Sequence, residues 1–484
     1  MEPIVRTRSG ALRGRTADGV TAYPGIPYAA PLDGPRRFQA PHPPDRWDGV
    51  REAVAHSPSV PQPAALPGLP SAWNPSDGTD ALSVNVWTPE PGAAGLPVLV
   101  WIHGGAYLAG TSADPTYDGA ALARGGVVVV TLNYRVGYEG FGWLPDAPAN
   151  RGLRDQLAAL RWVQEEIAGF GGDPGSVTIM GESAGGTSVA ALVAGPAAEG
   201  LFGRAIAQSA SGLFVDEAEA RRLAELITGG LGVEPTAAAL AGLPPEAVHA
   251  AHGPAFAAID ADRASWTNNT PYAAVVDGEL LTDLPWRAMR SGAGRSIDLI
   301  SGFNTDEAAL FTADVPPGGA DPEATAAGLR LPPGAVERYR AAHPGADDRA
   351  LTTLLLSDGL FRMPSVWCAD AHAAAGGRTH LYEFGWRTPA RGGVLGACHS
   401  LDVPFTFGAT GGPMAAALLE GSDPDEVAAL SGRIRGAWTS FAATGDPGWP
   451  RYDPERRLAR FWDSPPTVVA DPVAASRRIW HGRG

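Results

Sequence analysis

Residues 177–194 read VTIM-GESAGG-TSVAALVA, which is a short apolar run, a glycine-rich turn around Ser183 and a stretch that favours a helix. A G-x-S-x-G pattern between a buried strand and a helix is typical of a nucleophilic serine on a tight turn. Glycine at positions 181 and 185 lets the turn approach its neighbours without a clash. The hydroxyl then stands above a helix N-terminus, which favours developing negative charge. A plain glycine-rich turn fits the pentapeptide alone, but not this context.

Similar apolar runs, bounded by turn residues, recur at 98–102, 127–131, 205–207 and 297–300. Such runs are typical of strands buried on both faces of a mostly parallel sheet. From Leu153 to Ile167, apolar residues recur at helical spacing, which predicts an amphipathic crossover helix that ends near Gly169. Strand, helix and strand in this order predict a doubly wound α/β fold with its ligand sites at the carboxyl ends of the strands.

The rest of the chain contains no repeat or low-complexity linker that would separate two cores. We therefore expect one domain over 1–484, with mainly helical, alanine-rich insertions near 214–262, 321–356 and 413–444. The proline-, alanine- and serine-rich stretch 58–75 has no periodicity and predicts a long surface loop near a pocket mouth.

Composition excludes several function classes. The 37 basic residues are all arginine, so Schiff-base, pyridoxal-phosphate and Walker-A mechanisms, which need a lysine, are ruled out. A net charge of −15 without arginine clusters argues against nucleic-acid and anionic-membrane partners. Cys368 and Cys398 suit neither a disulfide framework nor a zinc site. We expect a soluble, cytoplasmic protein with no metal, no cofactor and, by a weak preference, a monomeric state.

A second glycine-rich segment follows the apolar run at 98–102 and reads His103-Gly104-Gly105-Ala106-Tyr107. Its backbone N–H groups could converge on an anionic oxygen, which is what acyl transfer requires for the tetrahedral intermediate. Alone, the segment fits a tight turn equally well. Together with Ser183 it favours an oxyanion loop.

With these two segments, the chain closely resembles the type-B carboxylesterase family of the α/β-hydrolase fold, which includes bacterial p-nitrobenzyl esterases and the cholinesterases. The resemblance runs nearly end to end. Its further landmarks are the segments GIPYA at 25–29, NVWTP at 85–89, NYRVG at 133–137 and FGGDP at 170–174.

The resemblance implies a Ser-Glu-His triad in an active-site gorge bordered by the helical insertions. The family's Asn-x-Asp-Glu segment matches Asn304 to Glu307, which makes Glu307 the acid and Asp306 a decoy. The family histidine matches His399, and the order 183, 307, 399 is that of α/β-hydrolases. By the same match, the N–H groups of Gly105, Ala106 and Ala184 are the oxyanion donors, and Ser209 supports the acid.

The sequence also departs from the family. Val60 and Ala81 occupy the positions of a disulfide found in eukaryotic relatives, and Thr79 replaces an acid that commonly pairs with Arg135. Arg135 is left to find Asp80, Asp155 or another partner. Trp73 resembles the tryptophan that holds choline in cholinesterases, but we interpret it as a loop anchor or an ordinary wall of the pocket.

The sequence thus predicts a serine carboxylesterase that acts on short-to-medium-chain or aromatic esters through an acyl-enzyme. One alternative keeps this chemistry but makes the protein an amidase, a carbamate hydrolase or an acyltransferase. Another is a catalytically inactive binding protein on the same fold, which the intact Ser183, Glu307 and His399 argue against. We interpret Cys398, next to His399, as a packing residue.

Overall fold

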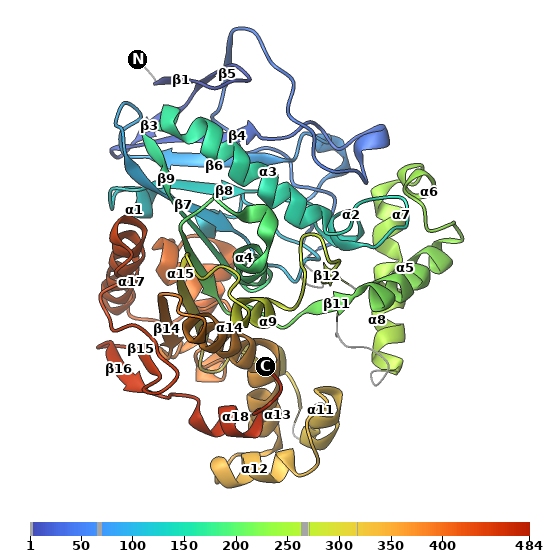
Figure 1. Ribbon diagram of the computed structural model, residues 1–484, viewed down its shortest axis with the longest axis vertical. Helices are drawn as coiled ribbons and strands as arrows, with labels where there is room; N and C mark the ends of the chain where they lie inside the picture. The colour runs from blue at the N-terminus through green and yellow to red at the C-terminus, as the bar shows by residue number, and fades with distance from the viewer. Residues whose placement is uncertain (1–2, 65–69, 263–269, 271, 317) are drawn as a thin grey trace.

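The computed structural model describes residues 3–64, 70–262, 270, 272–316 and 318–484. A large sheet runs through its centre in the order β16-β15-β14-β13-β10-β9-β7-β8-β6-β4-β3 (Figure 1). The strands are β3 (Arg15–Ala17), β4 (Val20–Pro27), β6 (Ser83–Thr88), β7 (Leu96–Ile102), β8 (Val128–Leu132), β9 (Gly172–Glu182), β10 (Arg204–Gln208), β13 (Asp298–Asn304), β14 (Thr379–Phe384), β15 (Leu458–Trp462) and β16 (Thr467–Ala470).

The centre of this sheet is parallel and its edges are antiparallel. Strands β8, β7, β9, β10, β13, β14 and β15 pair in parallel, whereas β6, β4 and β3 at one edge and β16 at the other pair antiparallel. Each apolar run singled out in the sequence lies in or overlaps one of the parallel strands. Helices cover both faces, so the predicted doubly wound α/β fold is confirmed.

Alternation along β7 shows how the sheet builds a core on each face. Val98, Val100 and Ile102 enter one core, to which α3 (Arg151–Glu166) and α4 (Ala184–Ala194) contribute. Leu99 and Trp101 enter the other, to which α1 (Ala120–Ala123) and α17 (Pro424–Thr444) contribute. Side chains that point to either face of this central strand are buried and apolar, which explains the continuous apolar run at 98–102.

The helices outside the segments 214–262 and 321–356 lie between or after the strands of the sheet along the chain. They are α1 (Ala120–Ala123), α2 (Gly137–Phe141), α3 (Arg151–Glu166), α4 (Ala184–Ala194), α9 (Pro285–Arg290), α10 (Ala309–Thr312), α14 (Met363–Ala374), α15 (Asp402–Phe407), α16 (Pro413–Leu418), α17 (Pro424–Thr444) and α18 (Ala474–Ile479). Helix α3 is the amphipathic helix expected from the sequence. A 3-10 turn over Ile167–Phe170 ends it near the predicted position.

Two of the three segments expected to be helical insertions, 214–262 and 321–356, form groups of helices away from the sheet (Figure 1). The third, 413–444, is helical as expected, but its long helix α17 packs on strands β7 and β9 of the sheet. Helices α5 (Glu217–Leu231), α6 (Ala237–Ala241), α7 (Pro245–Ala250) and α8 (His252–Ala261) lie at one side, and α11 (Pro322–Gly328), α12 (Ala335–Ala342) and α13 (Asp348–Ser357) at one end. The first segment begins as a strand, β11 (Phe214–Asp216), which pairs with β12 (Ala274–Val276). A small N-terminal sheet joins β1 (Ile4–Arg6), β2 (Ala11–Arg13) and β5 (Val50–Glu52).

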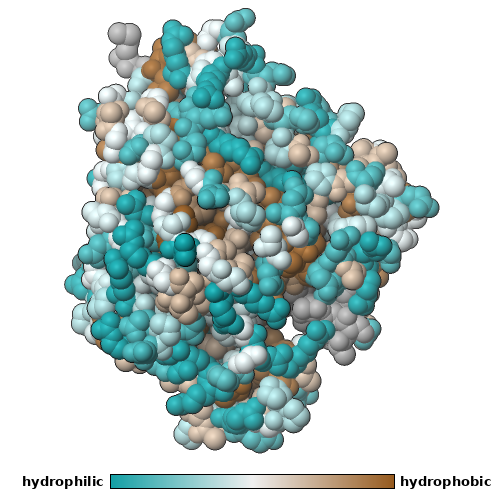
Figure 2. All heavy atoms as spheres, in the orientation of Figure 1, coloured by the Kyte–Doolittle hydropathy of each residue, from teal (hydrophilic) through white to brown (hydrophobic). Residues whose placement is uncertain are grey.

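The surface-loop prediction for 58–75 is wrong at residues 59–62, which are buried against the loop that follows β7. Residues 65–69 of that stretch lie outside the described residues. Hydrophilic side chains cover most of the face shown in Figure 2, with separate apolar patches between them. Within the described part of the chain, no helix has the length and apolar character needed to cross a membrane.

Candidate active site

Ser183 lies on the sharp turn between β9 and α4. Its backbone has φ 56° and ψ −124°, a strained conformation of the kind that clusters at functional sites. The N–H of Ser183 donates to the carbonyl of Gln208 at 3.0 Å, which ties the turn to β10. A Cβ on Gly185 would lie only 2.0 Å from the carbonyl oxygen of Ile102, so this position requires glycine. The turn thus holds a half-buried serine between buried neighbours.

The structure brings Ser183, His399 and Glu307 together. His399 lies before α15, and its Nε2 is 2.9 Å from Ser183 Oγ, while its Nδ1 is 2.7 Å from Glu307 Oε2. Glu307 follows β13, and its other oxygen accepts a hydrogen bond from the N–H of Asn304 at 2.8 Å. The N–H of His399 also donates to the carbonyl of Glu307 at 3.0 Å. Proton transfer from serine to imidazole is possible in this geometry.

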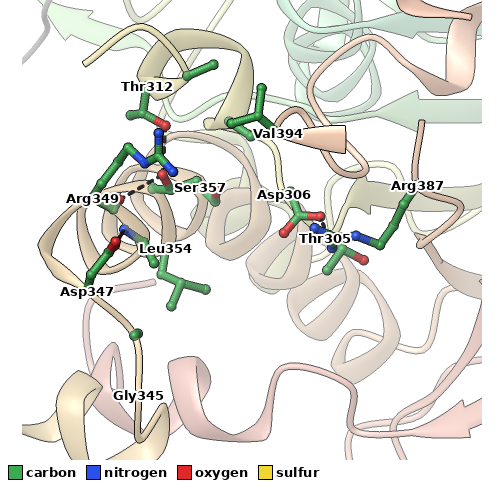
Figure 3. A pocket seen from close by; sticks show the side chains of 15 residues that line it. Thr305, Asp306, Thr312, Gly345, Asp347, Arg349, Leu354, Ser357, Arg387 and Val394 are labelled. Atoms are coloured by element: carbon green, nitrogen blue, oxygen red, sulfur yellow. Dashed lines mark hydrogen bonds and ion pairs between the residues drawn. The ribbon is translucent and has the colours of Figure 1, made fainter. Parts of the chain in front are cut away.

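Asp306, beside Glu307, points elsewhere. Its carboxylate pairs with Arg387 at 2.6 Å and accepts from the N–H of Ala397 at 2.9 Å. Figure 3 shows Asp306 and Arg387 at the wall of a cavity of about 390 Å³, whose lining also includes Ser357 and Arg349. Neither Ser183 nor His399 lines this cavity, so the two neighbouring acids face different environments.

Glu182 is a second carboxylate at the imidazole. Its Oε1 lies 3.3 Å from His399 Nε2 and accepts a hydrogen bond from Ser400 Oγ at 2.7 Å. Burial raises the pKa of Glu182 to about 7, although His399 opposes this. Burial alone would lower the pKa of His399, but Glu182, Glu307 and Asp402 outweigh it and raise that pKa to about 9. The site therefore stabilises a positive charge on the imidazole.

The glycine-rich loop after β7 lies against the nucleophile. A Cβ on Gly104 would be 3.1 Å from Cβ of Ser183. Gly105 adopts φ 113°, and a Cβ there would lie 1.9 Å from the carbonyl oxygen of Ala109. The N–H groups of Gly105, Ala106 and Ala184 donate no hydrogen bond to any residue that the structure describes. These three donors are therefore free to bind an anionic oxygen.

Gln62 anchors the far end of this loop. Its Nε2 donates to the carbonyl of Gly110 at 2.9 Å, and its Oε1 accepts from the N–H of the same residue at 2.7 Å. The side chain is buried, which strengthens both hydrogen bonds. Sequence reasoning assigned no role to Gln62, because its partner lies 48 positions away along the chain.

Ser209 directly follows Gln208, whose carbonyl binds the N–H of Ser183, but its hydroxyl makes no hydrogen bond to Glu307. Its N–H donates to the carbonyl of Gly302 at 2.8 Å, and φ is 49°. Its hydroxyl is buried and has no hydrogen-bond partner among the described residues, so the expected support of Glu307 is not seen. Trp73 packs edge-on against His249 of α7, with ring centroids 5.4 Å apart, an arrangement that fits a loop anchor. Cys398 is buried beside His399.

Two aromatic rings at the imidazole had no signal in the sequence. Phe361 stacks on His399 with ring centroids 4.1 Å apart and an interplanar angle of 27°. Phe311 lies 5.8 Å from the same ring at 46°, and its side chain is 53% exposed. Because this exposed aromatic side chain lies beside the imidazole, the site offers an apolar contact surface to a substrate. Among the described residues, no group of three or more His, Cys, Asp or Glu side chains could hold a metal ion.

Comparisons with known proteins extend over most of the chain. A model of the carboxylesterase family matches residues 1–327 and 335–464. The para-nitrobenzyl esterase of Bacillus subtilis (strain 168) is 36% identical over 492 residues, which cover 98% of each chain. Phenmedipham hydrolase of Pseudarthrobacter oxydans is 33% identical over 480 residues, or 93% of each chain. A crystal structure of a Geobacillus stearothermophilus carboxylesterase superposes with a TM-score of 0.87 at 37% identity, covering 99% of this chain and 100% of the other.

Proposed function

Because the chain belongs to the carboxylesterase family, has its α/β-hydrolase fold and is a carboxylic ester hydrolase, we propose that Ser183, His399 and Glu307 are its catalytic triad. The observation that carries the proposal is the continuous hydrogen-bonded path from Ser183 Oγ through both imidazole nitrogens to Glu307. Such a path is recognised by geometry and roles. The chain order also fits this fold.

In the proposed mechanism, His399 takes the proton of Ser183 as the serine oxygen attacks the ester carbonyl. Glu307 holds the imidazole by its Nδ1 and stabilises the imidazolium that forms. His399 then gives the proton to the departing alcohol, which leaves an acyl group on Ser183. Water activated by the same imidazole attacks this acyl-enzyme and releases the carboxylic acid. The mechanism we propose requires no metal or cofactor.

We propose that the N–H groups of Gly105, Ala106 and Ala184 bind the carbonyl oxygen as it becomes negative. Their lack of other partners among the described residues supports this role, because a donor already engaged could not respond to the new charge. Loss of one such donor typically raises the barrier by about 3 kcal/mol.

The proposed substrates are short-to-medium-chain or aromatic esters. The exposed ring of Phe311 beside His399 and the para-nitrobenzyl esterase of Bacillus subtilis among the relatives support this class. An amide or carbamate bond, or an acceptor other than water, would use the same triad. We further propose that the chain acts as one domain, as a monomer and in the cytoplasm, without nucleic acid.

The experiment compares p-nitrophenyl acetate, butyrate, octanoate and laurate with wild type and with Ser183→Ala. We expect the highest activity on the short chains and a loss of at least about 1000-fold with Ser183→Ala. Added alcohol or amine tests for acyl transfer, through analysis of the products. Substantial activity in Ser183→Ala would overturn the assignment of the nucleophile, and an inactive wild type would favour the acyltransferase or binding-protein alternatives.

The two neighbouring acids provide a matched pair of variants. We expect Glu307→Gln to lower kcat by about 1000-fold or more, because the imidazole loses the carboxylate that stabilises its positive charge. Asp306→Asn should lower it less than about tenfold, since this carboxylate binds Arg387 and not the imidazole. Equal losses in both variants would contradict the assignment of Glu307.

A further inference from the structure

The turn between α13 and α14 is π-helical over Asp358–Arg362. A π-turn inserts an extra residue into a helix and is frequent at functional sites. Here it delivers Phe361, whose ring is 6% exposed, onto the face of the His399 imidazole. The hydrogen bonds that join His399 with Ser183 and Glu307 do not involve this ring, so its placement calls for a separate explanation.

Polar contacts from several elements hold the π-turn. Asp358 and Arg362, at its two ends, form an ion pair at 3.2 Å, and both are buried. The hydroxyl of Tyr339 in α12 donates to Asp358 Oδ2 at 2.5 Å. The N–H of Gly212, which follows β10, donates to the carbonyl of Leu360 at 3.1 Å. The position of Phe361 is therefore fixed from outside the catalytic residues.

The carboxylates near His399 lie at its ring nitrogens, and the Phe361 ring covers the face of the imidazole. Glu182 is the last residue of β9 and lies at His399 Nε2, whereas Glu307 comes after β13 and lies at His399 Nδ1. Hydrogen bonds to these ring nitrogens lie in the plane of the ring. Asp402 of α15 adds a further negative charge nearby. The Phe361 ring lies above the face of the imidazole and is stacked on it, whereas the Phe311 ring is more distant and tilted. An aromatic face attracts a cation, most strongly where water is excluded.

We propose that Phe361 is a positioning residue for the esterase reaction, whose π face fixes the plane of the His399 imidazole and stabilises its protonated form. The proposal rests on the proposed role of His399 as general base. It gives the π-turn a function, because the turn aims the ring at a charge that exists only while the proton is on the imidazole.

The test replaces the π face by an alkyl group of similar size in Phe361→Leu. Losing the cation–π contact should lower the plateau of kcat/KM for p-nitrophenyl butyrate about three- to tenfold. It should also move the acid limb of the pH profile to lower pH by about half a unit to one unit, because the protonated imidazole is less stable. Phe361→Tyr, which keeps the ring, should retain the wild-type limb.

Phe311→Leu is the matched control, since it makes the same change in the more distant ring. We expect its acid limb to stay within about 0.2 units of wild type. A merely structural role for Phe361 would lower the plateau without moving the limb to lower pH, and that result would overturn the proposal. Should Phe361→Leu fail to fold, Phe361→Met fills the same space with a flexible chain and is read in the same way.

The Ser183→Ala variant separates the two hypotheses. If it is inactive while Phe361→Leu leaves the acid limb unmoved, the inference about Phe361 fails and the proposed triad stands. If it remains active, the proposed triad itself fails.

Discussion

At the scale of single residues, Glu182 and His399 control each other's protonation. Glu182 Oε1 lies 3.3 Å from His399 Nε2, and this carboxylate makes the largest contribution that raises the pKa of His399 against the lowering by burial. A general base must be neutral to accept a proton, so a raised pKa places the acid limb of the activity profile at higher pH. The carboxylate thus stabilises the imidazolium but restricts activity at low pH.

Glu182→Gln should therefore move the acid limb of kcat/KM to lower pH by about one unit, because the nearby negative charge is removed. The plateau should fall at the same time, since the imidazolium loses a stabilising charge. The measurement is kcat/KM for p-nitrophenyl acetate from about pH 6 to 11, a range that extends above the pKa of His399 at about 9. Asp306→Asn is the control, because that carboxylate is bound to Arg387. A limb that stays in place or moves to higher pH would contradict this coupling.

At the scale of elements, the sequence predicted the strands that contain a continuous, mainly apolar run and missed strands in which polar residues interrupt the apolar ones. Strand β14, Thr379–Phe384, contains His380 and Glu383, yet every residue in it is buried. His380 packs against Trp449, and Glu383 accepts a hydrogen bond from Thr305 at 2.7 Å. Residues from distant segments pack against or bind these side chains, so hydrophobic periodicity along the chain could not reveal the strand.

The residues of the candidate site also divide into those that the local sequence predicts and those whose role depends on distant parts of the chain. Ser183 was predictable from its own neighbours, because the turn imposes a local pattern of small residues. Glu307 and His399 needed the family resemblance, since a lone acid or histidine has no local signature. Phe361 and Glu182 gained their roles from the three-dimensional arrangement alone, through contacts with His399 that link separate elements.

The loop after β7 offers a prediction about how an element is held in place. Gln62→Leu should lower kcat by about tenfold or more, because Gly110 loses both hydrogen bonds that fix the far end of the loop. KM should change less, as no substrate contact is removed. The measurement is steady-state kinetics with p-nitrophenyl butyrate. Ser71→Ala, which removes a hydroxyl bound to the carbonyl of Gln62, is the control and should have a smaller effect. An unchanged kcat in Gln62→Leu would show that the loop does not need this anchor.

At the scale of the whole molecule, the parallel sheet is what assembles the site. Ser183 follows β9, Glu307 follows β13, and His399 comes after β14, so all three lie beyond the carboxyl ends of parallel strands. Segments that are distant in sequence therefore meet at one edge, as expected for this fold class. Their mutual geometry depends on the stability of the sheet and of the helices packed on it.

A buried ion pair joins three parts of this framework. Arg135, after β8, pairs with Asp155 of α3 at 2.7 Å, and neither side chain is exposed. Arg135 also donates to the carbonyl of Gln39 at 2.7 Å, which ties the N-terminal segment to the sheet and helix. Of the partners considered for Arg135, Asp155 is the one found, because Asp80 pairs with Arg51 at the surface.

Asp155→Ala should lower the free energy of unfolding by about 3–5 kcal/mol, since it leaves a buried guanidinium without a counter-charge. That is a large part of the total for a typical protein, about 5–15 kcal/mol. Glu279→Ala is the control: it removes the partner of Arg154 in a pair whose carboxylate is 70% exposed, and should cost less than about 1 kcal/mol. Urea-induced unfolding followed by tryptophan fluorescence compares the two. Equal decreases in the free energy of unfolding would mean that burial does not determine how much this ion pair stabilises the protein. A much larger decrease for Asp155→Ala would show that the buried pair stabilises the framework on which the site is built.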